Sequence, residues 1–164
     1  IFMKKDAENK VINADPTNTF TVGHNFMSTW THDEYKKLLG YKGQIETAEP
    51  TILSTEGIPA AKDWRTLGAV NAVKNQMQCG SCWAFGTTGV LEGAHAIQTG
   101  QLLSFSESLF TDCVKGIFDY GYISEPQPCC AGCNGGDYDA SFAWAGNNTI
   151  NLVLENDYKY TPTD

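Results

Sequence analysis

The clearest periodic stretch of the chain runs from Ser81 to Gly100. One face is formed by residues at helical steps, namely Phe85, Thr88, Leu91, His95 and Gln98. This face is widened by the further apolar residues Ala84, Val90, Ala94 and Ile97. This broad apolar face predicts a buried helix. Gly100 is a residue type that commonly ends helices, so we expect the helix to stop there.

Capping residues predict three further helices. Thr31 is a plausible N-cap for a helix that reaches almost to Gly40, with acidic residues in its first turn and lysines in its last. Ser106 is a plausible N-cap for a helix over 107–114, and residues 137–148 form the last candidate.

Two stretches lack any helical or strand period. Residues 44–59 are rich in Glu, Thr, Pro and Gly, and we expect an exposed linker where a protease would cut. Residues 115–137 are rich in glycine, proline and cysteine and are predicted to be a loop.

Composition narrows the class of protein. The 164 residues suffice for one domain with an extension, and 41% of them are hydrophobic, which is typical of globular proteins. A net charge of −8 argues against nucleic acid as a partner. No apolar run reaches the roughly 18 residues of a membrane span, so no membrane partner is expected.

All six cysteines lie in one third of the chain, at positions 79, 82, 113, 129, 130 and 133. Such density suggests disulfides or a metal site. Cys79/Cys82 and Cys130/Cys133 form two CxxC pairs, but the 47 residues between the pairs exceed the roughly 15–20 of a common zinc site. A thioredoxin-type redox site would have its Trp before the first Cys, whereas Trp83 follows the second.

A third possibility is a nucleophilic thiolate at Cys82. The residue would lie in the first turn of the predicted helix, where free N–H groups and the helix dipole stabilise an anion. Gln76 lies six residues upstream, so its amide could join the Cys82 N–H in an oxyanion hole.

The segment "QMQCGSCWAF" resembles the active-site segment of papain-like cysteine peptidases, the cathepsin group. Further segments resemble the same family in the same order: "IPAAKDWRTLGAVNAVKNQ", "FSESLFTDC", "GCNGG" and "DYKYTPTD". The resemblance covers residues 58–164. It implies an α+β fold of two lobes, with the helical lobe at 57–164. The β-rich lobe, which carries the catalytic His and Asn, is expected outside this sequence.

The resemblance implies a role for several residues. Cys82 would be the nucleophile and Gln76 the oxyanion donor, while Gly135 and Gly136 would bind the substrate backbone. The substrates would be polypeptides. No cofactor and no metal are implied, and the complete protein would be a monomer.

The resemblance also implies disulfide pairings. Cys79 would pair with Cys133, and Cys113 would pair with a cysteine just beyond the Tyr-x-Tyr segment, outside this sequence. Cys129 and Cys130 have no assigned partner, and extra bridges within 113–133 are the simplest expectation.

Residues 1–56 resemble the end of the inhibitory propeptide of cathepsin L-like zymogens, through "FTVGHNFMSTWTHDEYKKLLG". Gly23, Asn25, Thr31 and Glu34 fall on that pattern. Met27 replaces a usual Phe and Thr29 a usual Asp, which puts in doubt any pH trigger that relies on the Asp. The sequence thus resembles a zymogen trimmed at both ends, with its own propeptide as an intramolecular inhibitor.

The three histidines are not suited to be the catalytic base. His24 and His32 lie in the propeptide-like part, and His95 lies about 20 Å along the helix from Cys82. In this family the His follows the Cys by about 130–150 residues, and only 82 remain. We therefore expect this stretch alone to be inactive and poorly soluble. A catalytically dead peptide-binding or inhibitory relative and a zinc-binding CxxC module are the alternatives.

Three residues bear on specificity and location. Asp137 and Tyr138 follow Gly136, where the family usually places apolar residues that line a substrate pocket. We expect the Asp137 side chain to point to solvent and leave the pocket apolar. Asn147 begins a glycosylation sequon. The expected location is lysosomal, vacuolar or secreted.

Overall fold

The computed structural model describes residues 1–43, 52–118, 127–147 and 151–162. The chain divides into two compact units, Ile1–Lys37 and Leu38–Asp164. The boundary expected near residue 56 concerns propeptide removal and stays a prediction. By its contacts, the segment that begins at Leu38 belongs to the second unit.

The first unit contains α1 (Phe2–Ala14) and α2 (His32–Lys36). Thr31 is confirmed as the N-cap of α2, and it forms a reciprocal capping box with Glu34. The helix is shorter than predicted, because it ends at Lys36 instead of reaching almost to Gly40. The residues after Lys37 pair with the second unit, so they are not free to extend the helix.

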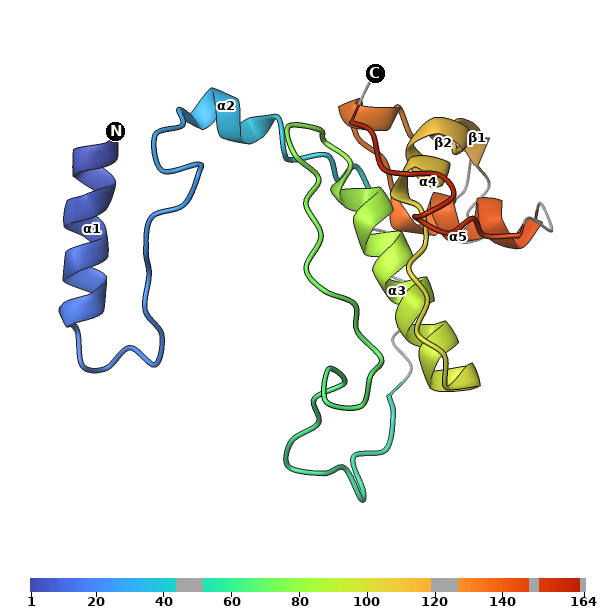
Figure 1. The fold of residues 1–164 in the computed structure, drawn as a ribbon, viewed down its shortest axis with the longest axis horizontal. Helices are drawn as coiled ribbons and strands as arrows, with labels where there is room; N and C mark the ends of the chain where they lie inside the picture. Colours follow the sequence, from blue (N-terminus) through green and yellow to red (C-terminus); the bar gives the residue numbers. More distant parts are fainter. Residues whose placement is uncertain (44–51, 119–126, 148–150, 163–164) are drawn as a thin grey trace. The chain divides into compact units, whose positions relative to one another are not determined.

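The second unit is built on α3 (Cys82–Thr99), and Figure 1 shows this helix beside α4 (Glu107–Cys113) and α5 (Tyr138–Asn147). Ser106 is confirmed as the N-cap of α4, and Gly100 ends α3 in a left-handed conformation as predicted. The core of this unit is a cluster of four fully buried residues, Trp83, Ala84, Phe110 and Val114.

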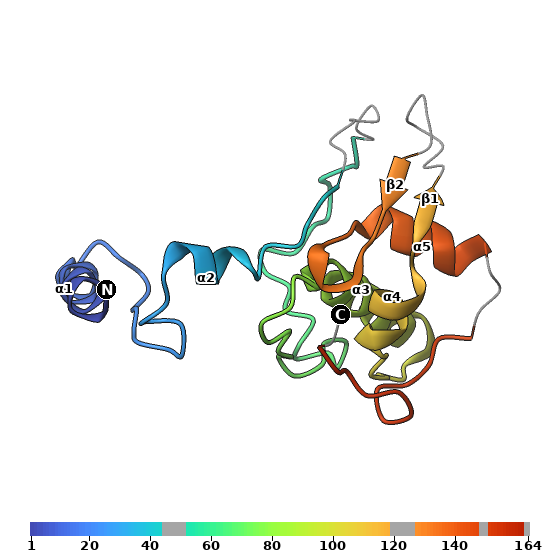
Figure 2. The same cartoon turned by 90° about the horizontal axis from the view of Figure 1, so that it is seen from above.

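The predicted loop over 115–137 is partly wrong. It contains two short antiparallel strands, β1 (Gly116–Phe118) and β2 (Gln127–Cys129), which lie side by side in Figure 2, and a turn of 3-10 helix at Gly132–Asn134. These are the only named strands in the described part of the chain, which is mainly helical, as expected for the helical lobe of an α+β fold.

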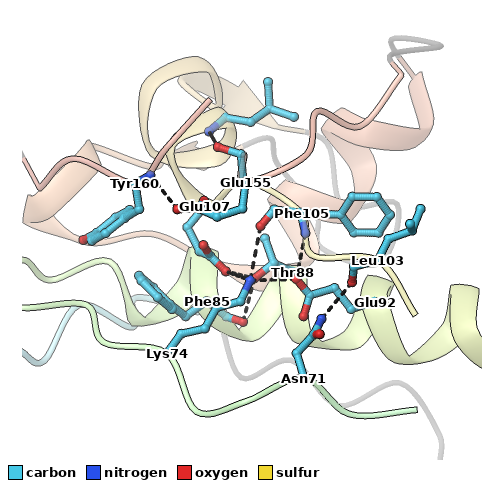
Figure 3. A network of polar contacts seen from close by, with 12 residues as sticks. Asn71, Lys74, Phe85, Thr88, Glu92, Leu103, Phe105, Glu107, Glu155 and Tyr160 are labelled. Carbon is cyan, nitrogen blue, oxygen red and sulfur yellow. Dashed lines mark hydrogen bonds and ion pairs between the residues drawn. The ribbon is translucent and has the colours of Figure 1, made fainter. Parts of the chain in front are cut away.

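A buried ionic network ties the segment before Gln76 to the two central helices (Figure 3). Lys74 Nζ lies 2.7 Å from Glu92 Oε1 on α3 and 2.6 Å from Glu107 Oε1 on α4. Both glutamates are almost fully buried, and Thr88 donates a further hydrogen bond to Glu107. Burial lowers the pKa of Lys74, but its hydrogen bonds to Glu107 and Glu92 outweigh burial and raise that pKa above its ordinary value.

Candidate active site

Cys82 is the first residue of α3 and follows the N-cap Ser81. Its thiol is free and half-buried. A side chain at this position lies beside the unpaired N–H groups of the first helical turn, which favour an anion. The helix start therefore suits a thiolate nucleophile.

The turn from Gln76 to Ser81 is fixed by three features. Met77 has a positive φ of 54°, and its N–H donates to Asn75 Oδ1 at 2.8 Å. A disulfide joins Cys79 to Cys133, and the N–H of Gly80 donates to the Cys133 carbonyl at 2.9 Å. The disulfide and this hydrogen bond therefore hold the turn against residues 132–136, which follow Cys82 in the sequence.

The Gln76 amide points at peptide carbonyls. Its Nε2 donates to the Cys79 carbonyl at 2.7 Å and to the Leu38 carbonyl at 3.0 Å. The first bond orients the side chain, and the second holds a carbonyl oxygen of a distant segment. An amide donor in this arrangement can also stabilise an oxyanion.

The segment that supplies Leu38 continues along Gly135 and Gly136. Gly136 donates to the Gly40 carbonyl at 2.8 Å, and Lys42 donates to the Gly136 carbonyl at 2.9 Å. These bonds form an isolated parallel bridge between Tyr41 and Gly136. The backbone at Gly136 is therefore able to pair with an extended peptide.

Gly136 must be glycine because its backbone lies against the indole of Trp83. A Cβ at this position would come within 2.5 Å of the ring. Trp83 is fully buried and donates from Nε1 to the Gly132 carbonyl at 3.2 Å. The residue after Cys82 thus packs directly under the backbone of Gly136.

The exposure of Asp137, the residue after Gly136, differs from the sequence expectation. This side chain is only 3% exposed, so the expectation that it points to solvent is wrong. Asp137 lies directly before α5, next to the fully buried Ala140 and Ser141 of its first turn, and Ser141 Oγ donates to its carbonyl at 2.8 Å.

Tyr138, which the sequence analysis placed with Asp137 at the expected substrate pocket, is the first residue of α5. Its ring stacks on Tyr41, with centroids 4.7 Å apart. Burial raises the pKa of Tyr138, and negative charge on Cys82 raises it further.

The sequence analysis did not identify Tyr160 as a residue near the site, although it noted the Tyr-x-Tyr segment to which Tyr160 belongs. Its hydroxyl lies 2.6 Å from Ser81 Oγ and donates to the Gln76 carbonyl at 3.0 Å. No local pattern shows these contacts, because residues 76 and 160 are far apart in the chain.

The histidine on α3, His95, is not in a position to act on Cys82. His95 is near the other end of α3, where its ring Nδ1 is 2.8 Å from the Gln101 carbonyl oxygen. His24 and His32 belong to the first unit.

The cysteine pairings overturn the zinc alternative. Cys79 and Cys133, one from each CxxC pair, are bonded to each other, and Cys130 is bonded to Cys129. Their thiolates are therefore not available as ligands, and the described residues contain no cluster of three metal-binding side chains. Cys113 is exposed and has a free thiol, so its pairing beyond this sequence stays a prediction.

A groove of about 540 Å³ lies away from the thiol. It runs between α3 and the preceding segment and is lined in part by Trp64, Val70, Val90 and Ile97. The 38–43 segment hydrogen-bonds to both Gln76 and Gly136.

Known proteins resemble this arrangement. The model of the papain family cysteine proteases matches residues 58–164. "Probable cysteine protease RD19B" of Arabidopsis thaliana is 43% identical over 84% of this chain and 38% of its own length. "Digestive cysteine proteinase 1" of Homarus americanus is 37% identical over 89% of this chain and 42% of its own.

A solved structure, the digestive procathepsin L2 proteinase from the larval midgut of Tenebrio molitor, superposes with a TM-score of 0.79 at 28% identity. The match covers 100% of this chain and 53% of the Tenebrio molitor chain. The chain thus spans about four tenths of the length of these curated relatives. On the family match and these identities, the chain belongs to the papain family of cysteine proteases.

Proposed function

We propose that the whole protein is a cysteine endopeptidase in which Cys82 attacks the scissile carbonyl of a polypeptide. The carbonyl oxygen would become an oxyanion held by Gln76 Nε2 and the Cys82 N–H. The observation that carries this proposal is the 3.0 Å hydrogen bond from Gln76 Nε2 to the Leu38 carbonyl, beside the start of α3.

The proposed chemistry has two steps. The Cys82 sulfur forms a thioester with the acyl part of the substrate, and the amine leaves with a proton. Water then hydrolyses the thioester and returns the thiol. Both steps need an imidazole to carry the proton, and this proposal places that imidazole outside residues 1–164.

We further propose that the protein is made as a zymogen and that the segment 38–43 blocks the cleft. Its bonds to Gln76 and Gly136 would compete with those of a substrate. The sequence expectation of a cleavable linker at 44–59 supplies the means of release. Residues 44–51 lie outside the described residues.

A test uses the full-length protein before and after removal of its N-terminal part. The processed form is expected to hydrolyse a fluorogenic peptide amide, and Cys82→Ser is expected to abolish the activity. Peptide binding without turnover by the processed form would instead support a catalytically dead relative. Equal turnover by Cys82→Ser would overturn the proposed role of Cys82.

The disulfides support a proposal about the cellular setting. Bonds such as Cys79–Cys133 persist in oxidising compartments, which supports a lysosomal, vacuolar or secreted protein. In the described part of the chain, no helix has the length and apolarity needed to cross a membrane. Asn147, the sequon asparagine, ends α5, and its side chain lies outside the described residues.

A further inference from the structure

The hydroxyl of Tyr160 joins the two halves of the proposed oxyanion site. It donates its single proton to the Gln76 carbonyl at 3.0 Å, because a carbonyl only accepts. The hydroxyl of Ser81, 2.6 Å away, must then be the donor in the other bond. One atom thus contacts the residue that carries the amide donor and the residue just before Cys82.

Ser81 does not behave as an ordinary N-cap. A serine at this position usually accepts a hydrogen bond from an N–H of the first helical turn. Ser81 is fully buried, and its side chain makes no such capping bond. Its hydroxyl faces Tyr160 instead, which leaves the N–H groups at the start of α3 uncapped by it.

Tyr160 is itself held from several sides. Its ring packs edge-on against Phe85, with centroids 4.8 Å apart. Its backbone N–H donates to Glu155 Oε1 at 2.9 Å, and Figure 3 shows this bond and the phenol beside Phe85. Burial raises the pKa of Tyr160, so the hydroxyl keeps its proton to higher pH than a free tyrosine.

We infer that Tyr160 is a positioning residue that sets the separation of the Gln76 amide and the Cys82 N–H through its bonds to Gln76 and Ser81. The inference rests on the proposed function. The tyrosine touches neither substrate nor thiol in this role. Its removal is expected to weaken oxyanion stabilisation and to leave the thiol itself unchanged.

The test compares Tyr160→Phe with Tyr158→Phe in the processed full-length protein. Tyr158 is a matched control, because its hydroxyl is exposed and donates to Asp112 at 2.6 Å. Tyr160→Phe is expected to lower kcat for a peptide amide by about tenfold or more, with KM little changed. Tyr158→Phe is expected to match the wild type.

A second readout separates positioning from general damage. Alkylation of Cys82 by iodoacetamide forms no oxyanion, so its rate is expected to be the same in Tyr160→Phe and wild type. Equal falls in alkylation and turnover would show that Tyr160 only supports the fold, and would overturn the inference.

A double-variant cycle tests the route through Gln76. If Tyr160 acts through that amide, Tyr160→Phe is expected to add little to the loss caused by Gln76→Ala. Ser81→Ala is expected to reproduce part of the loss and serves if Tyr160→Phe does not fold. Full additivity, or wild-type kcat in both Tyr160→Phe and Ser81→Ala, would overturn the inference. An inactive wild type would instead refute the proposed function.

Discussion

At the scale of single residues, the site depends on where two polar groups are held. Gln76 lies in a turn fixed by the Cys79–Cys133 disulfide, and Cys82 lies at the start of a buried helix. The Gln76 amide donates to the Leu38 and Cys79 carbonyls, and the Cys82 thiol is free. The chemistry of Cys82 therefore depends on the turn as much as on the cysteine.

Gln76→Ala in the processed full-length protein is expected to lower kcat by about 10²–10³-fold, the usual loss for an oxyanion donor. The rate of Cys82 alkylation is expected to stay the same. Gln78→Ala is the control, because Gln78 is exposed in the same turn. Wild-type turnover by the Gln76 variant would contradict the assigned role.

Residue-scale predictions from the sequence rested on a local motif, and contacts between distant residues lay beyond their reach. The cysteine and glutamine of the active-site segment were identified because they lie six residues apart. Tyr160 was not, because its contacts to Ser81 and Gln76 span about eighty residues. Asp137 was misjudged for the same reason, since its burial depends on how α5 packs.

At the scale of elements, the segment around Lys74 is tied to α3 and α4 by buried charges. Glu92 and Glu107 share this one lysine in the network of Figure 3. Lys74 is two residues before Gln76, so the network anchors the segment that leads to the proposed oxyanion donor. Removal of the Lys74 ammonium would leave the buried carboxylates of Glu92 and Glu107 without this cationic partner.

Lys74→Met is expected to lower the free energy of unfolding by about 3–5 kcal/mol, the usual cost of removing one partner of a buried ion pair. Urea unfolding of the full-length protein, followed by tryptophan fluorescence, measures this change. Lys115→Met is the control at an exposed lysine. A loss below about 1 kcal/mol for Lys74→Met would show that the network is well solvated.

Another element-scale prediction concerns the segment 38–43. A Cβ at Gly40 would overlap the backbone carbonyl of Gly80, so Gly40→Ala is expected to displace the segment. Cys82 in the unprocessed full-length protein should then react faster with iodoacetamide. Gly23→Ala is the control, because a Cβ there has open space around it. Unchanged alkylation in Gly40→Ala would argue against blockage by this segment.

Among the elements, capping and periodicity predicted α3, α4 and α5 closely, because these signals are local. The end of α2 was placed too late, since pairing of the following residues with Gly136 is a long-range event. The strands β1 and β2 were missed because three-residue strands carry almost no period of their own.

At the scale of the whole molecule, the second unit carries apolar side chains on its surface. Val73, Val90 and Ile97 are each more than half exposed, and two of them line the groove along α3. Such a surface is typical of a face that another part of a protein covers.

A polypeptide limited to residues 57–164 is therefore expected to self-associate. Size-exclusion chromatography with light scattering checks this, and replacement of Val90 and Ile97 by Gln is expected to reduce the association. A monodisperse monomer that unfolds cooperatively would contradict the prediction.

The most direct test of the central claim is to trap the acyl-enzyme. The processed full-length protein is mixed with an activated ester, quenched in acid within one turnover, and digested for mass spectrometry. The account predicts that the acyl group is found on the peptide that contains Cys82. Release of the leaving group with no adduct on Cys82, and at the same rate in Cys82→Ser, would contradict it.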